Sequence, residues 1–116
     1  RHDAAYVEAE GFWVRGRDAA KFAVLPMDET GAAVAGGVVR LRVQNGGAAG
    51  NAISIESGTF QKLVVLEPFH DQEIEVPAGE GGLTSIRIAA GDGFVPADRD
   101  PKSADRRLLG AWIQIR

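Results

Sequence analysis

Histidine and carboxylate side chains are the groups of this sequence that could carry out acid–base chemistry. The two histidines, His2 and His70, stand far apart, and no serine has the Gly-x-Ser-x-Gly setting of a nucleophile elbow. Acidic residues are more numerous, but Glu73 and Glu75 alternate with apolar residues. That alternation predicts a solvated strand face rather than a pair of catalytic acids. We therefore expect no catalytic residue and predict that the chain is not an enzyme.

Three aspartates, Asp98, Asp100 and Asp105, stand close together in a polar segment. A flexible loop with several carboxylates is what Ca²⁺ requires, so calcium is one interpretation. The spacing differs from that of an EF-hand, and neighbouring arginines such as Arg99 and Arg106 neutralise the acidic charge. We expect charge pairing within the loop instead of a metal site. The chain has no cysteine, which excludes disulfides and thiolate metal sites, and no other cofactor is indicated.

Trp13 and Trp112 are the candidates for ligand binding, because the C–H faces of sugar rings stack on exposed aromatic rings. Both alternate with apolar neighbours, which predicts that both point away from the core. The same parity places Arg15 beside Trp13 and Gln114 beside Trp112, so these four residues form the expected binding surface. The alternative is structural: two tryptophans on paired first and last strands would simply pack against each other.

Short segments of alternating apolar and polar residues recur along the chain, separated by glycine-containing turns such as residues 45–47 and 91–93. This pattern predicts an all-β fold, a two-sheet antiparallel β-sandwich of jelly-roll or Ig-like type with about eight short strands. The expected strands are residues 6–15 (one or two strands), 21–25, 39–43, 52–56, 61–66, 72–76, 83–88 and 108–115. Residues 21–25 and 61–66 are apolar on both faces, so we expect them to be central strands. No segment has convincing helical periodicity.

The totals fit one folded domain that spans residues 1–116, with 45% hydrophobic and 25% charged residues. Charges of both signs are interspersed and the net charge is −3, which argues against a nucleic-acid partner. No apolar run approaches the roughly 20 residues of a membrane span. The sequence begins at Arg1 without a signal-peptide pattern, and we expect it to be a piece of a larger protein.

The carboxyl-terminal part carries a pattern of Phe94-x-Pro96, an acidic spacer, and Asp105-x-Arg107-x-Leu-Gly110 before a terminal strand. This pattern resembles that of accessory β-sandwich domains in bacterial extracytoplasmic proteins that handle glycans. They include the tails of polytopic glycosyltransferase-like membrane proteins. Residues 11–14 and 43–46 fit the same kind of module. The resemblance implies an accessory domain outside the cytoplasm rather than the transferase itself, and it carries over no catalytic residue.

The resemblance also suggests a physical role for the polar loop of residues 96–107. Asp105 and one of two arginines, Arg106 or Arg107, would pin this loop by charge-assisted hydrogen bonds before the final strand. Gly110 would then allow a close approach, for example by the ring of Trp13. Two functions stay open: a module that binds or positions carbohydrate for a larger cell-envelope or secreted protein, or a structural, protein-interaction domain without affinity for sugar.

Overall fold

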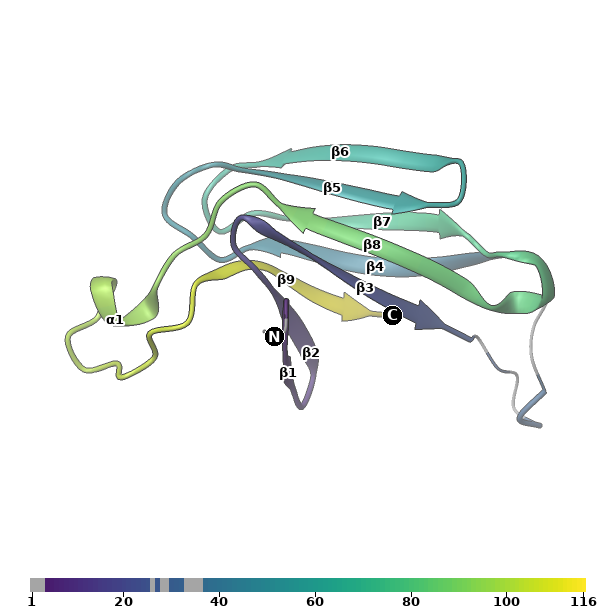
Figure 1. The fold of residues 1–116 in the computed structure, drawn as a ribbon, viewed down its shortest axis with the longest axis horizontal. Helices are drawn as coiled ribbons and strands as arrows, with labels where there is room; N and C mark the ends of the chain where they lie inside the picture. Colours follow the sequence, from purple (N-terminus) through teal and green to yellow (C-terminus); the bar gives the residue numbers. More distant parts are fainter. Residues whose placement is uncertain (1–3, 26, 28–29, 33–36) are drawn as a thin grey trace.

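The described residues fold into nine β-strands that form two antiparallel sheets (Figure 1). The computed structural model describes residues 4–25, 27, 30–32 and 37–116. One sheet has the strand order β1-β2-β9-β4-β7, and the other has the order β3-β8-β5-β6. The strands are β1 (Ala5–Glu8), β2 (Gly11–Arg15), β3 (Asp18–Val24), β4 (Val38–Asn45), β5 (Asn51–Ser57), β6 (Phe60–Leu66), β7 (Asp71–Pro77), β8 (Thr84–Ala90) and β9 (Leu109–Ile115). The expected two-sheet antiparallel β-sandwich is thereby confirmed.

The strand pairing distinguishes between the two sandwich types that the sequence left open. Strand β5 pairs with β6, β4 with β7, β3 with β8 and β2 with β9, all antiparallel. Such nested pairs arise when one long hairpin is rolled into two sheets, which is the jelly-roll arrangement. Strand β1 pairs with β2 at the edge of the larger sheet. Because of the nesting, the second strand, β2, and the last strand, β9, lie side by side.

The core lies between the two sheets and follows the alternation of the strands. On β4, Val39, Leu41 and Val43 are buried, whereas Arg40 is exposed and Arg42 is half-buried. Each such buried aliphatic side chain contributes about 1.5–3 kcal/mol through loss of water contact. The other strands supply further core residues, which are Val14, Ala20, Ile53, Ile55, Val64, Leu66, Ile74, Val76, Ile86, Ile88, Ala90, Ala111 and Ile113.

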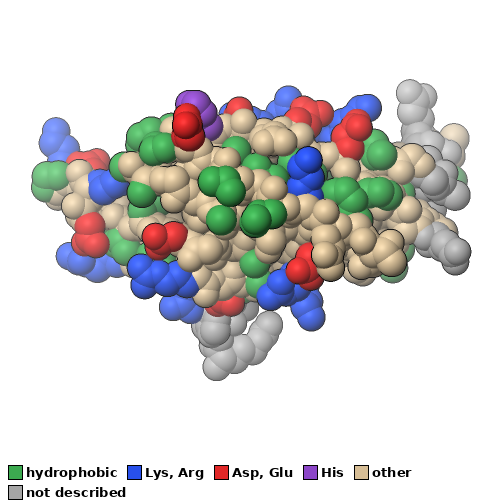
Figure 2. Space-filling model, turned by 90° about the horizontal axis from the view of Figure 1, so that it is seen from above, with side chains coloured by type: hydrophobic (Ala, Val, Ile, Leu, Met, Phe, Trp, Pro, Cys, Tyr) green, Lys and Arg blue, Asp and Glu red, His purple; other side chains and the backbone are tan. Residues whose placement is uncertain are grey.

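The expectation that residues 21–25 and 61–66 form central strands is wrong. Strands β3 and β6 are the two edges of the four-stranded sheet. Leu63 and Val65 of β6 point outward, and they remain 66% and 71% exposed. Figure 2, which views the molecule from the side of β6, shows hydrophobic side chains at the surface in the middle of this face. Apolar residues on both faces of a strand therefore do not imply burial on both faces, because the outer face of a two-sheet sandwich can meet solvent.

Two short helical segments interrupt the β-structure, where the sequence indicated only loops. A 3₁₀ turn, η1 (Glu80–Gly82), precedes β8, and one helical turn, α1 (Pro96–Arg99), lies in the long loop before β9. Proline at the first position favours α1, because its φ is already helical and its missing N–H needs no partner there. The helix projects from one end of the sandwich (Figure 1).

Three glycines cross at the point where the chain passes between the two sheets. A Cβ on Gly16 would lie 2.7 Å from the Cα of Gly93, and a Cβ on Gly110 would lie 3.0 Å from the Cα of Gly16. Gly110 does allow a close approach, but its nearest neighbours are Ala90 and the backbone of Val14, not Trp13 as expected. The crossing fixes the loop after β8 against the start of β9.

Candidate functional site

One row of side chains runs across all five strands of the larger sheet. The strand registers place Tyr6 opposite Trp13, Trp13 opposite Trp112, Trp112 opposite Gln44, and Gln44 opposite Asp71. Directly opposite residues of antiparallel strands have their Cβ atoms about 5 Å apart, so they form a continuous row. The residues that flank this row in β4 and β9 are buried, and in β2 Val14 is buried and Phe12 is half-buried against the core. The row therefore lies on the outer face.

The two tryptophans form the centre of an aromatic cluster. The ring centroids of Trp13 and Trp112 are 5.2 Å apart, and Phe94 meets Trp13 edge to face at 5.7 Å. Such pairs stabilise by about 0.5–1.5 kcal/mol beyond the burial of area. Both tryptophans are half-buried and lie outside the inter-sheet core. They pack against each other and still present part of their surface to solvent.

Gly11, at the start of β2, and Gly46, directly after β4, let these rings lie close to the backbone. A Cβ on Gly46 would come within 2.7 Å of Trp13 Cη2 and 3.0 Å of Phe94 Cε1, and a Cβ on Gly11 within 2.9 Å of Trp112 Cζ2. Real Cβ atoms avoid such distances, so a side chain at Gly46 or Gly11 would displace the ring above it. The absence of side chains at these two positions shapes the aromatic surface.

A solvent-open hollow of about 440 Å³ lies over this cluster. We call it the aromatic hollow; its lining residues are Glu8, Trp13, Gln44, Gly46, Phe69, Phe94 and Trp112. Its volume is in the range of small-molecule sites, and it combines aromatic walls with a carboxylate and an amide. A larger hollow of about 550 Å³ lies over β3, β8 and the β5–β6 turn, with Lys21, Glu56 and Arg87 in its lining. Its aromatic residue, Phe22, packs against Phe12 towards the core, so that surface has no aromatic platform.

Phe69 and Arg99 border the aromatic hollow on the side of the long loop. The Arg99 guanidinium lies 4.2 Å from the centroid of Phe94 and 5.5 Å from that of Phe69, and its Nη2 donates to the carbonyl of Gly46 at 3.2 Å. Phe69 is exposed and has a φ of 63°, in the left-handed region that costs a non-glycine residue about 1–2 kcal/mol. The tight turn that precedes β7 thus holds a phenylalanine ring at the rim.

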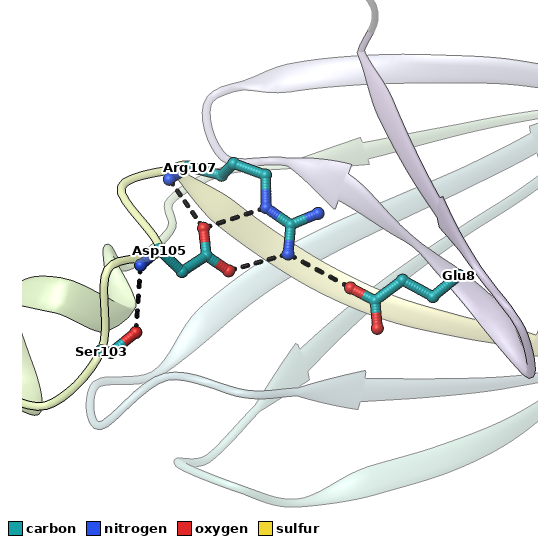
Figure 3. Close-up of polar contacts among 4 residues, drawn as sticks. All are labelled: Glu8, Ser103, Asp105 and Arg107. Atoms are coloured by element: carbon teal, nitrogen blue, oxygen red, sulfur yellow. Dashed lines mark hydrogen bonds and ion pairs between the residues drawn. The ribbon is translucent and has the colours of Figure 1, made fainter.

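A charge-assisted cluster ties the long loop to β1 (Figure 3). Nε and Nη2 of Arg107 donate to the two carboxylate oxygens of Asp105 at 2.9 and 2.7 Å, and Nη2 also donates to Glu8 at 3.2 Å. The Arg107 backbone N–H donates to the same carboxylate, and Ser103 Oγ accepts from the Asp105 backbone N–H. The arginine that contacts Asp105 is thus Arg107, whereas Arg106 is exposed and lies outside the cluster.

The same cluster shifts the pKa values of two of its members. Hydrogen bonds from the Arg107 side chain and backbone lower the pKa of Asp105 to about 2, and the Asp105 carboxylate raises the pKa of Arg107. The Arg107 guanidinium also lies 5.1 Å from the centroid of Tyr6, so the cluster reaches the β1 end of the row of side chains that crosses the larger sheet. The loop that carries Arg99 is therefore anchored next to the aromatic hollow.

The remaining candidate residues lie beside the hollow rather than in it. Gln114 accepts from Arg42 Nη1 at 2.8 Å and donates to the carbonyl of Glu10. Arg15 follows a register shift in β2 and pairs with Leu109. The structure thus brings Trp13 and Trp112 together but adds neither Arg15 nor Gln114 to the lining of their hollow.

Sequence reasoning did not identify Gln44, Phe69 and Phe94 as parts of the site. Gln44 continues the alternation of the strand predicted at 39–43, so its outward orientation was readable. Which strand lies beside it was not readable, because register between distant strands is set in three dimensions. Phe69 and Phe94 lie in turns, where periodicity gives no orientation.

The three aspartates of the long loop are not brought together as calcium ligands. The Asp105 carboxylate is held by Arg107, and the Asp100 carboxylate accepts from the Lys102 backbone N–H. Within residues 4–116, apart from those the structure does not describe, no three His, Asp or Glu side chains converge. His70 is exposed with Nδ1 3.7 Å from Glu67, and His2 lies outside the described residues.

Comparison with known proteins adds no relative to these observations. No protein-family model matches the chain, and no curated protein shows significant sequence similarity to it. No helix in the described part of the chain is both long and apolar enough to pass through a bilayer.

Proposed function

We propose that this β-sandwich is a non-catalytic accessory domain that binds carbohydrate in the aromatic hollow on behalf of a larger bacterial cell-envelope or secreted protein. The observation that carries the proposal is the Trp13–Trp112 pair, held on the outer face with part of both rings open to solvent. Because pyranose and furanose rings present C–H groups on one face, they stack on such surfaces. Since the rings are already packed in place, little side-chain entropy is lost on binding.

The polar groups of the hollow suit sugar hydroxyls. The Gln44 amide lies beside Trp112 in the same row and makes no hydrogen bond to any other residue that the structure describes. An amide can donate to one hydroxyl and accept from another, which orients a ring that stacking alone would leave free to rotate. The carboxylate in the lining, Glu8, is ion-paired with Arg107. This pairing supports a binding role over acid–base catalysis.

A structural, protein-interaction role without sugar affinity is the second candidate. It is favoured by the exposed Leu63 and Val65 on the edge strand β6, where an unpaired strand edge and apolar side chains occur together. The partner in that case is the remainder of the parent protein. Both candidates share the proposed extracytoplasmic location, which rests on the resemblance of the carboxyl-terminal pattern.

Two glutamines on the same face provide a matched test of the proposed function. Gln44 lines the aromatic hollow, whereas Gln114 lies outside it, and both are half-buried. In affinity electrophoresis through gels that contain cell-envelope or plant polysaccharides, we expect at least one polysaccharide to retard the domain. Gln44→Ala should weaken that retardation about fivefold, the effect of losing one hydrogen bond of about 1 kcal/mol, while Gln114→Ala should leave it unchanged.

Two results would contradict the proposal. One is that no polysaccharide retards the domain, which favours the protein-interaction role. The other is that Gln114→Ala abolishes retardation while Gln44→Ala has no effect, which would place the binding surface elsewhere on the sheet. Melting temperatures of both variants show whether an effect comes from loss of folding.

A further inference from the structure

Arg99 is a cation at the rim of the aromatic hollow, and it has no carboxylate partner among the residues that the structure describes. Three arginines on the same sheet face or at its border are paired: Arg40 with Glu75, Arg42 with Asp71, and Arg107 with Asp105. In contrast, no carboxylate of the described residues forms an ion pair with Arg99, although aspartates precede and follow it in the sequence. Its positive charge is therefore available to a ligand.

The Arg99 guanidinium is held in place without using most of its donors. One face lies over Phe94, and one of its five N–H groups goes to the carbonyl of Gly46. Arg99 ends α1, and the Ala97 backbone N–H donates to the carbonyl of Asp105 at 2.8 Å, so the helical turn is tied to the anchored part of the loop. A positioned, unpaired guanidinium is suited to bind a planar carboxylate or an ester of sulfate or phosphate.

A second hollow adjoins the first on the other side of Phe94. This loop hollow, of about 260 Å³, is lined by Asn45, Gly47, Ala48, Ala49, Gly50, Asn51, Asp92, Gly93, Phe94 and Arg99. The Asp92 carboxylate in it is engaged by Arg17 and by the Gly93 backbone N–H. A chain of sugars that starts on Trp112 and passes over Phe94 therefore enters the loop hollow. The unpaired charge in that hollow is the guanidinium of Arg99.

We infer that the ligand is an acidic glycan, with neutral sugar faces on Trp13 and Trp112 and an anionic substituent at Arg99. This inference rests on the proposed function, because it specifies the ligand of the same site. A cationic ligand is disfavoured although aromatic clusters bind quaternary ammonium groups, since the protein's own Arg99 already occupies the faces of Phe94 and Phe69.

Pairs of glycans that differ in whether their anionic group is present and charged test this inference by calorimetric titration. The pairs are oligogalacturonate and its methyl ester, sulfated galactan and its desulfated form, and phosphomannan and its dephosphorylated form. We expect the anionic member of at least one pair to bind at least tenfold more tightly, and the pair that responds tells carboxylate from sulfate or phosphate recognition. Arg99→Gln should reduce that difference to less than twofold.

Arg106→Gln is the matched control, because Arg106 is exposed, nearby in the sequence and outside the Asp105–Arg107 cluster, and the variant has the same net charge. It should keep the preference for the anionic member, and Arg99→Lys should keep part of it. Equal affinities within every pair that binds would overturn the inference and leave the proposed function standing. No binding of any member, charged or neutral, would count against the proposed function itself.

Discussion

At the scale of residues, the Asp105–Arg107 pair explains how the charged loop is held against β1. The sequence predicted charge pairing within residues 96–107, and the structure assigns it to Arg107 rather than Arg106. A local turn accounts for this choice: the Arg107 backbone N–H donates to the Asp105 carboxylate at 3.0 Å, the contact of an Asx turn. This turn brings the Arg107 side chain, rather than that of Arg106, to the carboxylate.

Asp105 should be the carboxyl group whose ionisation controls the loop at low pH. Its pKa in the folded chain is about 2, below the ordinary aspartate value of 3.8, so folding favours the ionised form. The stabilisation is therefore fully present above about pH 4 and is lost as the pH falls through about 2. A ¹³C-detected NMR titration should give Asp105 a midpoint well below that of an ordinary aspartate.

Loss of the Asp105 charge should loosen the loop of residues 96–107. Because Asp105→Asn removes that charge at every pH, this variant should have a looser loop at neutral pH. We expect faster cleavage by trypsin within residues 96–107, while Asp98→Asn, which leaves the pair with Arg107 intact, should not change it. An Asp105 midpoint near 4 together with unchanged cleavage in Asp105→Asn would contradict the pinning role of this pair.

At the scale of elements, the crossing of Gly16, Gly93 and Gly110 explains why two sheets meet so closely at one end. These glycines have no left-handed φ, so they are needed for space rather than for backbone freedom. They carry the chain past the start of β9 and fix the origin of the long loop. Substitution of one of these glycines by alanine adds a single methyl group and therefore tests this need for space.

Gly110→Ala should destabilise the domain by about 1–3 kcal/mol, the usual effect of overpacking. Its Cβ would lie 2.6 Å from the Cβ of Ala90 and 2.8 Å from the carbonyl oxygen of Val14, and neither can move freely. Gly50→Ala is the control, since its nearest neighbour, the Leu66 carbonyl oxygen, is at an ordinary 3.7 Å. Equal free energies of unfolding for the two variants, from urea titrations, would show that the crossing tolerates a side chain.

The strands themselves could largely be predicted from the sequence, because alternation depends on neighbours in the chain. Which strands lie next to each other in the sheets could not be predicted in this way. The apolar residues on both faces of β6 suggested a central strand, yet Leu63 and Val65 face solvent at the edge of a sheet. Alternation tells which residues share a face. It does not tell which strands lie beside a strand in the sheet, or whether another layer covers its face.

At the scale of the whole molecule, the jelly roll builds the aromatic hollow from distant parts of the chain. Nested pairing brings Trp13 of β2 beside Trp112 of β9, and β4 follows with Gln44. Turns before β7 and after β8 add Phe69 and Phe94. The sequence identified both tryptophans from their parity, but jelly-roll and Ig-like sandwiches have the same alternation, so it could not identify which residues surround them.

The central claim, that the Trp13–Trp112 surface binds glycan, is tested most directly by tryptophan fluorescence during titration with a panel of cell-envelope and plant glycans. The matched variants are Gly46→Ala, whose Cβ would displace Trp13, and Gln114→Ala, which lies on the same sheet face outside both hollows. We expect a saturable shift in emission for the natural sequence and Gln114→Ala, and a loss of at least tenfold in apparent affinity for Gly46→Ala. A flat response across the whole panel, with emission typical of packed rings, would contradict the claim and leave the tryptophans as structural residues.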